Sequence, residues 1–120
     1  MIIIAGTIEV DADKRDPCVV ASTPIQQATR DDEPGCLAYC FSADPAVPER
    51  IQVYELWTDQ ESLAAHFAHP NYFAMRKMFA DYGPLKAHNL KYRIDASEPV
   101  YDPSHTPRAD FFTLTNEGPQ

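Results

Sequence analysis

RIQVYELWTDQESLAAHFAHP, residues 50–70, predicts a strand that runs directly into a capped helix, and the rest of the chain is organised around it. Alternation along the strand places four residues on one face: Ile51, Val53, Glu55 and Trp57. That face carries a carboxylate beside the chain's only tryptophan, and His66 follows within three turns of helix. We therefore expect any chemistry of the chain to lie here.

The helix of this stretch has a predicted start and a predicted end. Thr58 and Glu61 have the Thr-x-x-Glu spacing of a capping box, which satisfies free amides of the first helical turn. Leu63 and Phe67 lie four residues apart and form the predicted inward stripe. Pro70 ends the run because proline lacks the amide hydrogen that would continue the helix.

Three further strands are predicted from alternation. Residues 2–10 are apolar on both faces, which indicates a strand that is covered on both sides. Residues 36–41 follow a tight Glu33-Pro34-Gly35 turn, and three of them share one face: Leu37, Tyr39 and Phe41. Residues 85–95 form the last predicted strand.

Helical periodicity predicts two more helical segments. The apolar stripe of the first consists of Cys18, Ala21, Ile25 and Ala28. Pro24 lies inside this segment, removes one hydrogen bond at a cost of about 3 kcal/mol, and predicts a kink or a break. The second segment follows Pro70 and is ended by Gly83-Pro84. Its stripe consists of Tyr72, Met75, Phe79 and Tyr82.

The order of the elements predicts an α+β fold of the ferredoxin-like type, a βαββαβ plait with an antiparallel sheet. Right-handed crossovers place the first and third strands at the centre of that sheet. The helices cover only one face, so we expect a second copy of the chain to bury the other. We therefore predict a homodimer, with a domain over residues 1–96 and an extended tail over residues 97–120 in each subunit.

Composition limits the partners and the compartment. The 120-residue chain is 44% apolar and has a net charge of −8, from 18 acids and 10 bases. Such a surface repels phosphate groups, so neither nucleic acid nor a membrane is a predicted partner. Cys36 and Cys40 lie too far apart on an extended strand to form a disulfide and are interpreted as reduced, packed thiols. Without a predicted signal peptide or membrane span, the expected location is the cytoplasm.

Trp57 and Glu55 each have two interpretations. Trp57 either belongs to the core or lines a pocket and donates its N–H to a bound oxygen. A carboxylate such as Glu55 on the helix-covered face is costly unless it is paired or functional. The structural alternative gives Glu55 a basic partner such as Arg76 or Lys77.

His66 also has two interpretations: it is either a buried histidine with its hydrogen bonds satisfied or a functional residue. With His69 it has the i, i+3 spacing of a metal clamp, but the two directions on the helix diverge and no Cys/His cluster supports a site. We therefore predict no metal. Tyr72 and Phe73, after the helix break, either line a pocket or only pack.

Four short stretches, in order, together with the spacing from Leu63 to His66, resemble the antibiotic biosynthesis monooxygenase domain family of the dimeric α+β barrel superfamily. They are GTIEV (6–10), EPGCLAY (33–39), YELWTD (54–59) and HPNYF (69–73), and the likeness covers residues 1 to about 95. The resemblance implies a ferredoxin-like homodimer with a pocket between sheet and helices. Members of the family include cofactor-free oxygenases that convert phenols and hydroquinones to quinones.

The resemblance also implies roles for single residues. The predicted catalytic residues are His66, Trp57 and Glu55. The predicted substrate-binding residues are Tyr72, Phe73, Tyr39 and Phe67. Two features depart from the family pattern: Pro24 interrupts a helix that is usually continuous, and the tail from Ser97 is longer than the core needs. Thr7 stands where haem-degrading relatives have an Asn, which argues against haem.

These expectations combine into a mechanistic hypothesis without any cofactor. The chain has no Gly-rich phosphate loop, nucleophile elbow or CxxC motif. His66 would take the proton of a small aromatic phenol or hydroquinone, and the Trp57 N–H would hold the phenolate while it reacts with O2. The alternative is a non-catalytic, dimeric small-molecule-binding or stress-response protein of the same fold.

Overall fold

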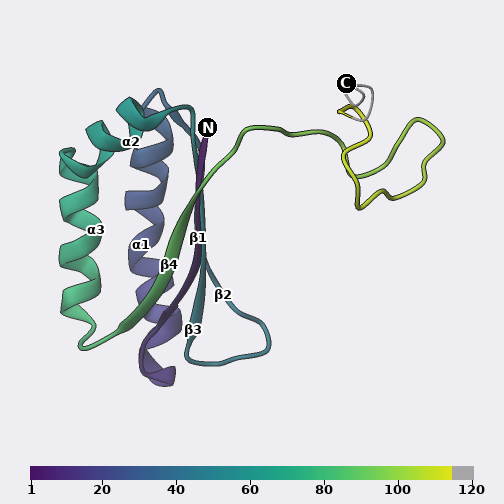
Figure 1. The fold of residues 1–120 in the computed structure, drawn as a ribbon. Helices are drawn as coiled ribbons and strands as arrows, with labels where there is room; N and C mark the ends of the chain where they lie inside the picture. Colours follow the sequence, from purple (N-terminus) through teal and green to yellow (C-terminus); the bar gives the residue numbers. More distant parts are fainter. Residues whose placement is uncertain (115–120) are drawn as a thin grey trace.

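The predicted order of elements is confirmed in a computed structural model, which describes residues 1–114 (Figure 1). The elements are β1 (Ile2–Glu9), α1 (Ala12–Asp32), β2 (Cys36–Ala43), β3 (Arg50–Trp57), α2 (Gln60–Phe67), α3 (Pro70–Asp81) and β4 (Lys86–Arg93). The four strands form one antiparallel sheet in the order β2-β3-β1-β4. The fold is therefore α+β and ferredoxin-like, with the first and third strands at the centre of the sheet.

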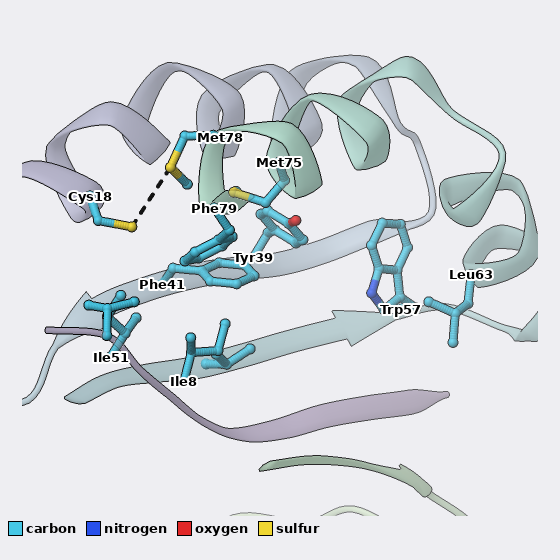
Figure 2. Packing of buried hydrophobic residues seen from close by; sticks show 12 residues of the cluster. Ile8, Cys18, Tyr39, Phe41, Ile51, Trp57, Leu63, Met75, Met78 and Phe79 are labelled. Atoms are coloured by element: carbon cyan, nitrogen blue, oxygen red, sulfur yellow. Dashed lines mark hydrogen bonds between the residues drawn. The ribbon is translucent and has the colours of Figure 1, made fainter. Parts of the chain in front are cut away.

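All three helices lie on one side of the sheet (Figure 1). The predicted alternation of β3 is confirmed, since Ile51, Val53, Glu55 and Trp57 are all at most 7% exposed. Ile51, Val53 and Trp57 belong to a single apolar core that also includes Tyr39, Phe41, Leu63 and Phe79 (Figure 2). The opposite face of the sheet has no helical layer in the described part of the chain.

Two local details of α2 differ from the sequence prediction. The N-cap is Asp59 rather than Thr58, and its carboxylate accepts a hydrogen bond of 2.7 Å from the Ser62 amide. The inward face consists of Leu63 and His66, whereas Phe67 is 45% exposed. Neighbouring helical residues point about 100° apart, so a helix that buries His66 beside Leu63 exposes Phe67.

No break occurs at Pro24, so the prediction of a break, one of the two alternatives, was wrong: α1 is helical from Ala12 to Asp32. Pro24 cannot donate to the carbonyl of Val20, but Val20 lies on the outer face and is 71% exposed, so water can satisfy that carbonyl. The fully buried face of α1 also differs from the predicted apolar stripe. It consists of Cys18, Ser22, Gln26 and Thr29.

The polar face of α1 lies against the free edge of β2. Gln26 pairs with both backbone groups of Phe41: its Nε2 donates to the carbonyl at 3.0 Å and its Oε1 accepts from the amide at 3.1 Å. Arg30 Nε donates to the carbonyl of Tyr39 at 2.8 Å. A bulge between Cys36 and Ala38 turns Leu37 outward, so it does not share a face with Tyr39 as predicted.

The cysteines are free, but only Cys18 is buried, while Cys36 is half-buried and Cys40 is exposed. The predicted packing of Cys40 as a small hydrophobe was therefore wrong. Beyond β4 the chain leaves the sheet and folds on itself away from the helices (Figure 1). The last part of the predicted tail, residues 115–120, lies outside the described residues. Within residues 1–114, no helix has the length and apolar character to span a membrane.

Candidate functional site

A cavity of about 920 Å³ lies between the sheet and helices α2 and α3, and β4 borders it. Its aromatic wall consists of Tyr39, Phe41, Phe67, Tyr72 and Phe79. Its polar side chains are those of Glu55, His66, Arg76, Asn89 and Lys91. This volume is that of a small-molecule site, in which a few polar groups orient a mainly apolar ligand.

His66 is held by a carboxylate from the far end of α1. Its Nδ1 lies 2.8 Å from Glu33 Oε1, and both residues are almost completely buried. The other oxygen of Glu33, Oε2, accepts a 3.1 Å hydrogen bond from Asn71 Nδ2 at the start of α3. Glu33 therefore joins the ends of three helices at one point and fixes the direction of the imidazole.

The Glu33 contact also sets the chemistry of His66. A carboxylate oxygen accepts hydrogen bonds, so the imidazole proton belongs on Nδ1 and the lone pair of Nε2 is left for the cavity. Burial lowers the pKa of His66, and the hydrogen bond to Glu33 opposes this shift in part. A neutral imidazole with a free nitrogen and a carboxylate behind it is suited to take a proton from a bound molecule.

Aromatic rings enclose the imidazole on several sides. The centre of the Trp57 ring lies 4.5 Å from the centre of the imidazole at an interplanar angle of 35°, and the ring centres of Tyr39 and Tyr72 each lie 5.5 Å away in edge-on arrangements. These contacts exclude water from the ring and account for its desolvation. They also hold the ring plane in place, so that His66 faces the cavity in one orientation.

Glu55 and Trp57 form a pair of their own. The indole Nε1–H donates to Glu55 Oε1 at 3.0 Å, so the partner of this carboxylate is Trp57 and neither Arg76 nor Lys77. Burial raises the pKa of Glu55 to about 7, and the Trp57 hydrogen bond opposes the shift. At neutral pH this carboxyl is therefore partly protonated and can donate a hydrogen bond into the cavity as well as accept one.

Five of the seven predicted site residues line the cavity. They are Glu55, His66, Tyr39, Phe67 and Tyr72. Trp57 does not line it: the side chain is 0% exposed and belongs to the core next to Leu63 (Figure 2). Phe73 also lies outside, at 54% exposed, because one residue of helix turns it about 100° away from Tyr72.

The sequence prediction missed Glu33 and Asn71. Glu33 is the C-cap of α1 and was interpreted only as part of a turn. One signal was available in the sequence. An acid at a helix C-terminus interacts unfavourably with the helix dipole, so its presence there indicates a compensating partner. Its partner His66 lies 33 residues further along the chain, so only the fold brings the two together.

The histidine pair does not form a clamp. His69 caps α3, where its Nδ1 accepts a 3.0 Å hydrogen bond from the Asn71 amide, while His66 Nδ1 faces Glu33. Within residues 1–114, no group of three or more His, Cys, Asp or Glu side chains has an arrangement that could hold a metal ion.

Residues 1–78 match the family model described as antibiotic biosynthesis monooxygenase. The chain belongs to this family. All of the helices and strands except β4 lie wholly or mainly in the matched residues. So do Glu33, Glu55, His66 and Tyr72, whereas Asn89 and Lys91 of the cavity come from beyond the match.

This member of the antibiotic biosynthesis monooxygenase family is similar to an uncharacterised protein in sequence and to solved structures in fold. An uncharacterised protein of Synechocystis is 33% identical over 69 residues, which cover 58% of this chain and 46% of the relative, so the match spans about half of that relative's length. Candidate antibiotic biosynthesis monooxygenases from Deinococcus radiodurans and Nitrosomonas europaea have solved structures. Their TM-scores are 0.74 and 0.66, their identities are 23% and 24%, and they cover 85% and 80% of this chain and 100% of their own.

Proposed function

We propose that this chain is a cofactor-independent monooxygenase that oxidises a small phenol or hydroquinone with O2 and works as a homodimer. The observation that carries the proposal is the buried Glu33–His66 pair at the wall of an aromatic cavity. Its geometry suits removal of a proton from a hydroxyl group, which is the step that makes a phenol reactive toward oxygen.

The proposed reaction starts at Nε2 of His66. This nitrogen takes the phenolic proton, and the Glu33 carboxylate stabilises the imidazolium that forms. The phenolate gives one electron to O2, and the resulting radical and superoxide combine to form a carbon–oxygen bond. His66 returns its proton to the distal oxygen of this peroxide. Loss of water, which takes the hydrogen of the same ring carbon, gives the quinone, so that phenol and O2 become quinone and H2O.

Glu55 takes over the role that we predicted for the Trp57 N–H. That N–H donates to Glu55, so it is not available to hold a phenolate. Glu55 lines the cavity, and its pKa of about 7 lets the protonated carboxyl donate to the negative oxygen. Trp57 is therefore a positioning residue in this proposal, acting through Glu55 and through its contact with His66.

Oxygen uptake with a panel of hydroquinones, without added metal or flavin, tests the proposal. We expect His66→Ala to slow uptake by a factor of about one hundred or more, the usual contribution of a general base. His88→Ala is the matched control, because His88 lies on the exposed strand β4 and does not line the cavity. Equal rates in wild type and His66→Ala would remove His66 from the mechanism.

The alternative, a non-catalytic binding protein, predicts a different result in the same assay. Such a protein would bind the hydroquinones in the cavity, as ligand quenching of Trp57 fluorescence would report, and would consume no oxygen. One observation favours this alternative: the Trp57 indole is buried and its N–H already donates to Glu55, so it cannot serve as the predicted donor to a phenolate oxygen. Binding without uptake across the panel would therefore overturn the oxygenase proposal.

A further inference from the structure

Two cationic side chains line the cavity of a strongly acidic protein. Arg76 comes from α3 and Lys91 from β4, and both residues are exposed. The chain has 18 acids and 10 bases, yet neither of these two cations forms an ion pair with an acid in the described residues. The neighbouring Lys77 behaves differently, since its Nζ lies 3.1 Å from Asp81 and it is not part of the cavity.

Arg76 is linked to the reactive histidine through one aromatic ring. Its guanidinium carbon lies 5.8 Å from the centre of the Tyr72 ring, and the Tyr72 ring lies 5.5 Å from that of His66. The imidazole and the guanidinium are thus no further apart than the sum of these two distances. A single aromatic ring held along Tyr72 can therefore face His66 with one end and Arg76 with the other.

Lys91 faces the same space from the sheet. It is the register partner of Ile4 on β1, and partners in antiparallel strands carry their side chains on the same face. Ile4 lines the cavity, so the helix-covered face of β4 directs Lys91 toward it. The two cations therefore come from opposite layers of the fold, the helices and the sheet, and meet at one cavity.

We propose that this cavity selects an aromatic ligand that carries a carboxylate, with the ring along Tyr72, the hydroxyl at His66 and the carboxylate between Arg76 and Lys91. The assignment of the hydroxyl end rests on the proposed function, whereas the carboxylate end rests only on the two cations. A planar guanidinium and a carboxylate form two parallel hydrogen bonds, which gives this end both direction and affinity. An unpaired cation at the cavity wall also attracts anions that the acidic surface repels elsewhere.

Calorimetric titration with 4-hydroxybenzoate and with its neutral isostere 4-hydroxybenzamide tests the selection. We expect the wild type to bind the benzoate at least about tenfold more tightly, and Arg76→Met and Lys91→Met each to reduce that ratio about fivefold, the effect of a partly exposed ion pair. The affinity for the amide should stay within about twofold in both variants. Arg76→Lys keeps the charge and should restore part of the ratio.

Lys77→Met is the matched control, because it removes the same charge one residue from Arg76 but outside the cavity. An equal loss in Lys77→Met and Arg76→Met would mean that only the overall charge matters and would overturn the proposal. Equal binding of benzoate and amide by the wild type, or no binding of either, would also overturn it. The proposed function is tested separately, because it is contradicted if neutral hydroquinones cause no oxygen uptake. That result would not affect the comparison of benzoate and benzamide binding.

Discussion

At the scale of single residues, the chemistry of the site depends on how burial changes the protonation of His66 and Glu55. His66 and Glu55 are both desolvated, which lowers the pKa of the imidazole and raises the pKa of the carboxyl. Both groups are therefore driven toward their neutral forms in the same cavity. Glu33 opposes the shift of His66 toward the neutral form by accepting a hydrogen bond from Nδ1–H. The same hydrogen bond keeps the imidazole in one defined tautomer. A proton acceptor and a proton donor therefore line the same cavity.

Glu55 should make the protein less stable as the pH rises. Burial raises its pKa in the folded protein from 4.5 to about 7, so between these values the folded state binds more protons than the unfolded state. The stability that this carboxyl contributes is complete below about pH 4.5 and is lost as the pH rises to about 7. The glutamine of Glu55→Gln does not titrate. The free energy of unfolding of this variant minus that of wild type should therefore increase by roughly 3 kcal/mol from about pH 4 to about pH 8.

Urea unfolding at several pH values measures this difference. Glu61→Gln, at an exposed acid of α2, controls for the general effect of removing one negative charge. A constant difference between Glu55→Gln and wild type across this range would mean that Glu55 has an ordinary pKa. The proposed role of a protonated Glu55 as donor would then be withdrawn.

At the scale of elements, α1 acts as a substitute for a fifth strand. β2 lies at the edge of the sheet, where an uncovered backbone is a template for pairing with other chains. Gln26 takes up the amide and the carbonyl of Phe41 as a neighbouring strand would, and Arg30 takes up the carbonyl of Tyr39. The polar buried face of α1 therefore has a structural function, which is to satisfy that edge.

Gln26→Leu should destabilise the fold by about 2–4 kcal/mol. The leucine fits a buried position but leaves the amide and the carbonyl of Phe41 without partners, and each unsatisfied buried group costs about 1–3 kcal/mol. Chemical denaturation measures the loss. Gln27→Leu is the control, because Gln27 is exposed and its amide contacts only Asp31 one turn further along. Similar midpoints for the two variants would contradict the strand-like role of Gln26.

Pro24→Ala should stabilise the protein by about 1–3 kcal/mol. The helix is continuous through Pro24, so alanine restores an amide that can donate to the Val20 carbonyl and removes the steric cost of the ring. Thermal unfolding should report a higher midpoint. Pro70→Ala is the comparison, because Pro70 is the first residue of α3, where no hydrogen bond is lost, and it should give no gain. A lower midpoint for Pro24→Ala would mean that α1 requires the proline.

These elements indicate what the sequence could and could not predict. The alternation of β3 was predictable because a half-buried strand puts every second side chain into the core, and Ile51 and Trp57 do so. The inward face of α1 was not predictable, because hydrophobic periodicity does not detect polar side chains such as Gln26, which are buried because they form hydrogen bonds with a backbone. The Glu33–His66 pair was also out of reach, since it depends on the packing of two helices that are distant in the sequence.

At the scale of the whole molecule, no helix of residues 1–114 covers the second face of the sheet (Figure 1). Two apolar rows cross it in register: Leu56, Ile3 and Tyr92 in one, and Tyr54, Ala5 and Leu90 in the other. Tyr54, Leu90 and Tyr92 are 42%, 64% and 50% exposed. The radius of gyration is 17.3 Å, against about 14 Å for a compact chain of this length, because the segment after β4 projects from the domain (Figure 1). The exposed apolar side chains favour a second subunit on this face.

If the uncovered face is the dimer interface, a charge placed at its centre should separate the subunits. Tyr54→Lys puts an ammonium beside Ala5 and Cys40, and a twofold interface would bury two such charges without partners, which should raise the dimer dissociation constant at least about a hundredfold. Sedimentation equilibrium measures the constant. Val20→Lys is the matched control, because Val20 is 71% exposed on the outer face of α1 and its replacement should leave the dimer intact. A wild type that is monomeric at micromolar concentration, or equal constants for the two variants, would contradict the dimer. The cavity lies on the opposite, helix-covered side, so Tyr54→Lys should keep the binding ratio between hydroxybenzoate and hydroxybenzamide even as a monomer.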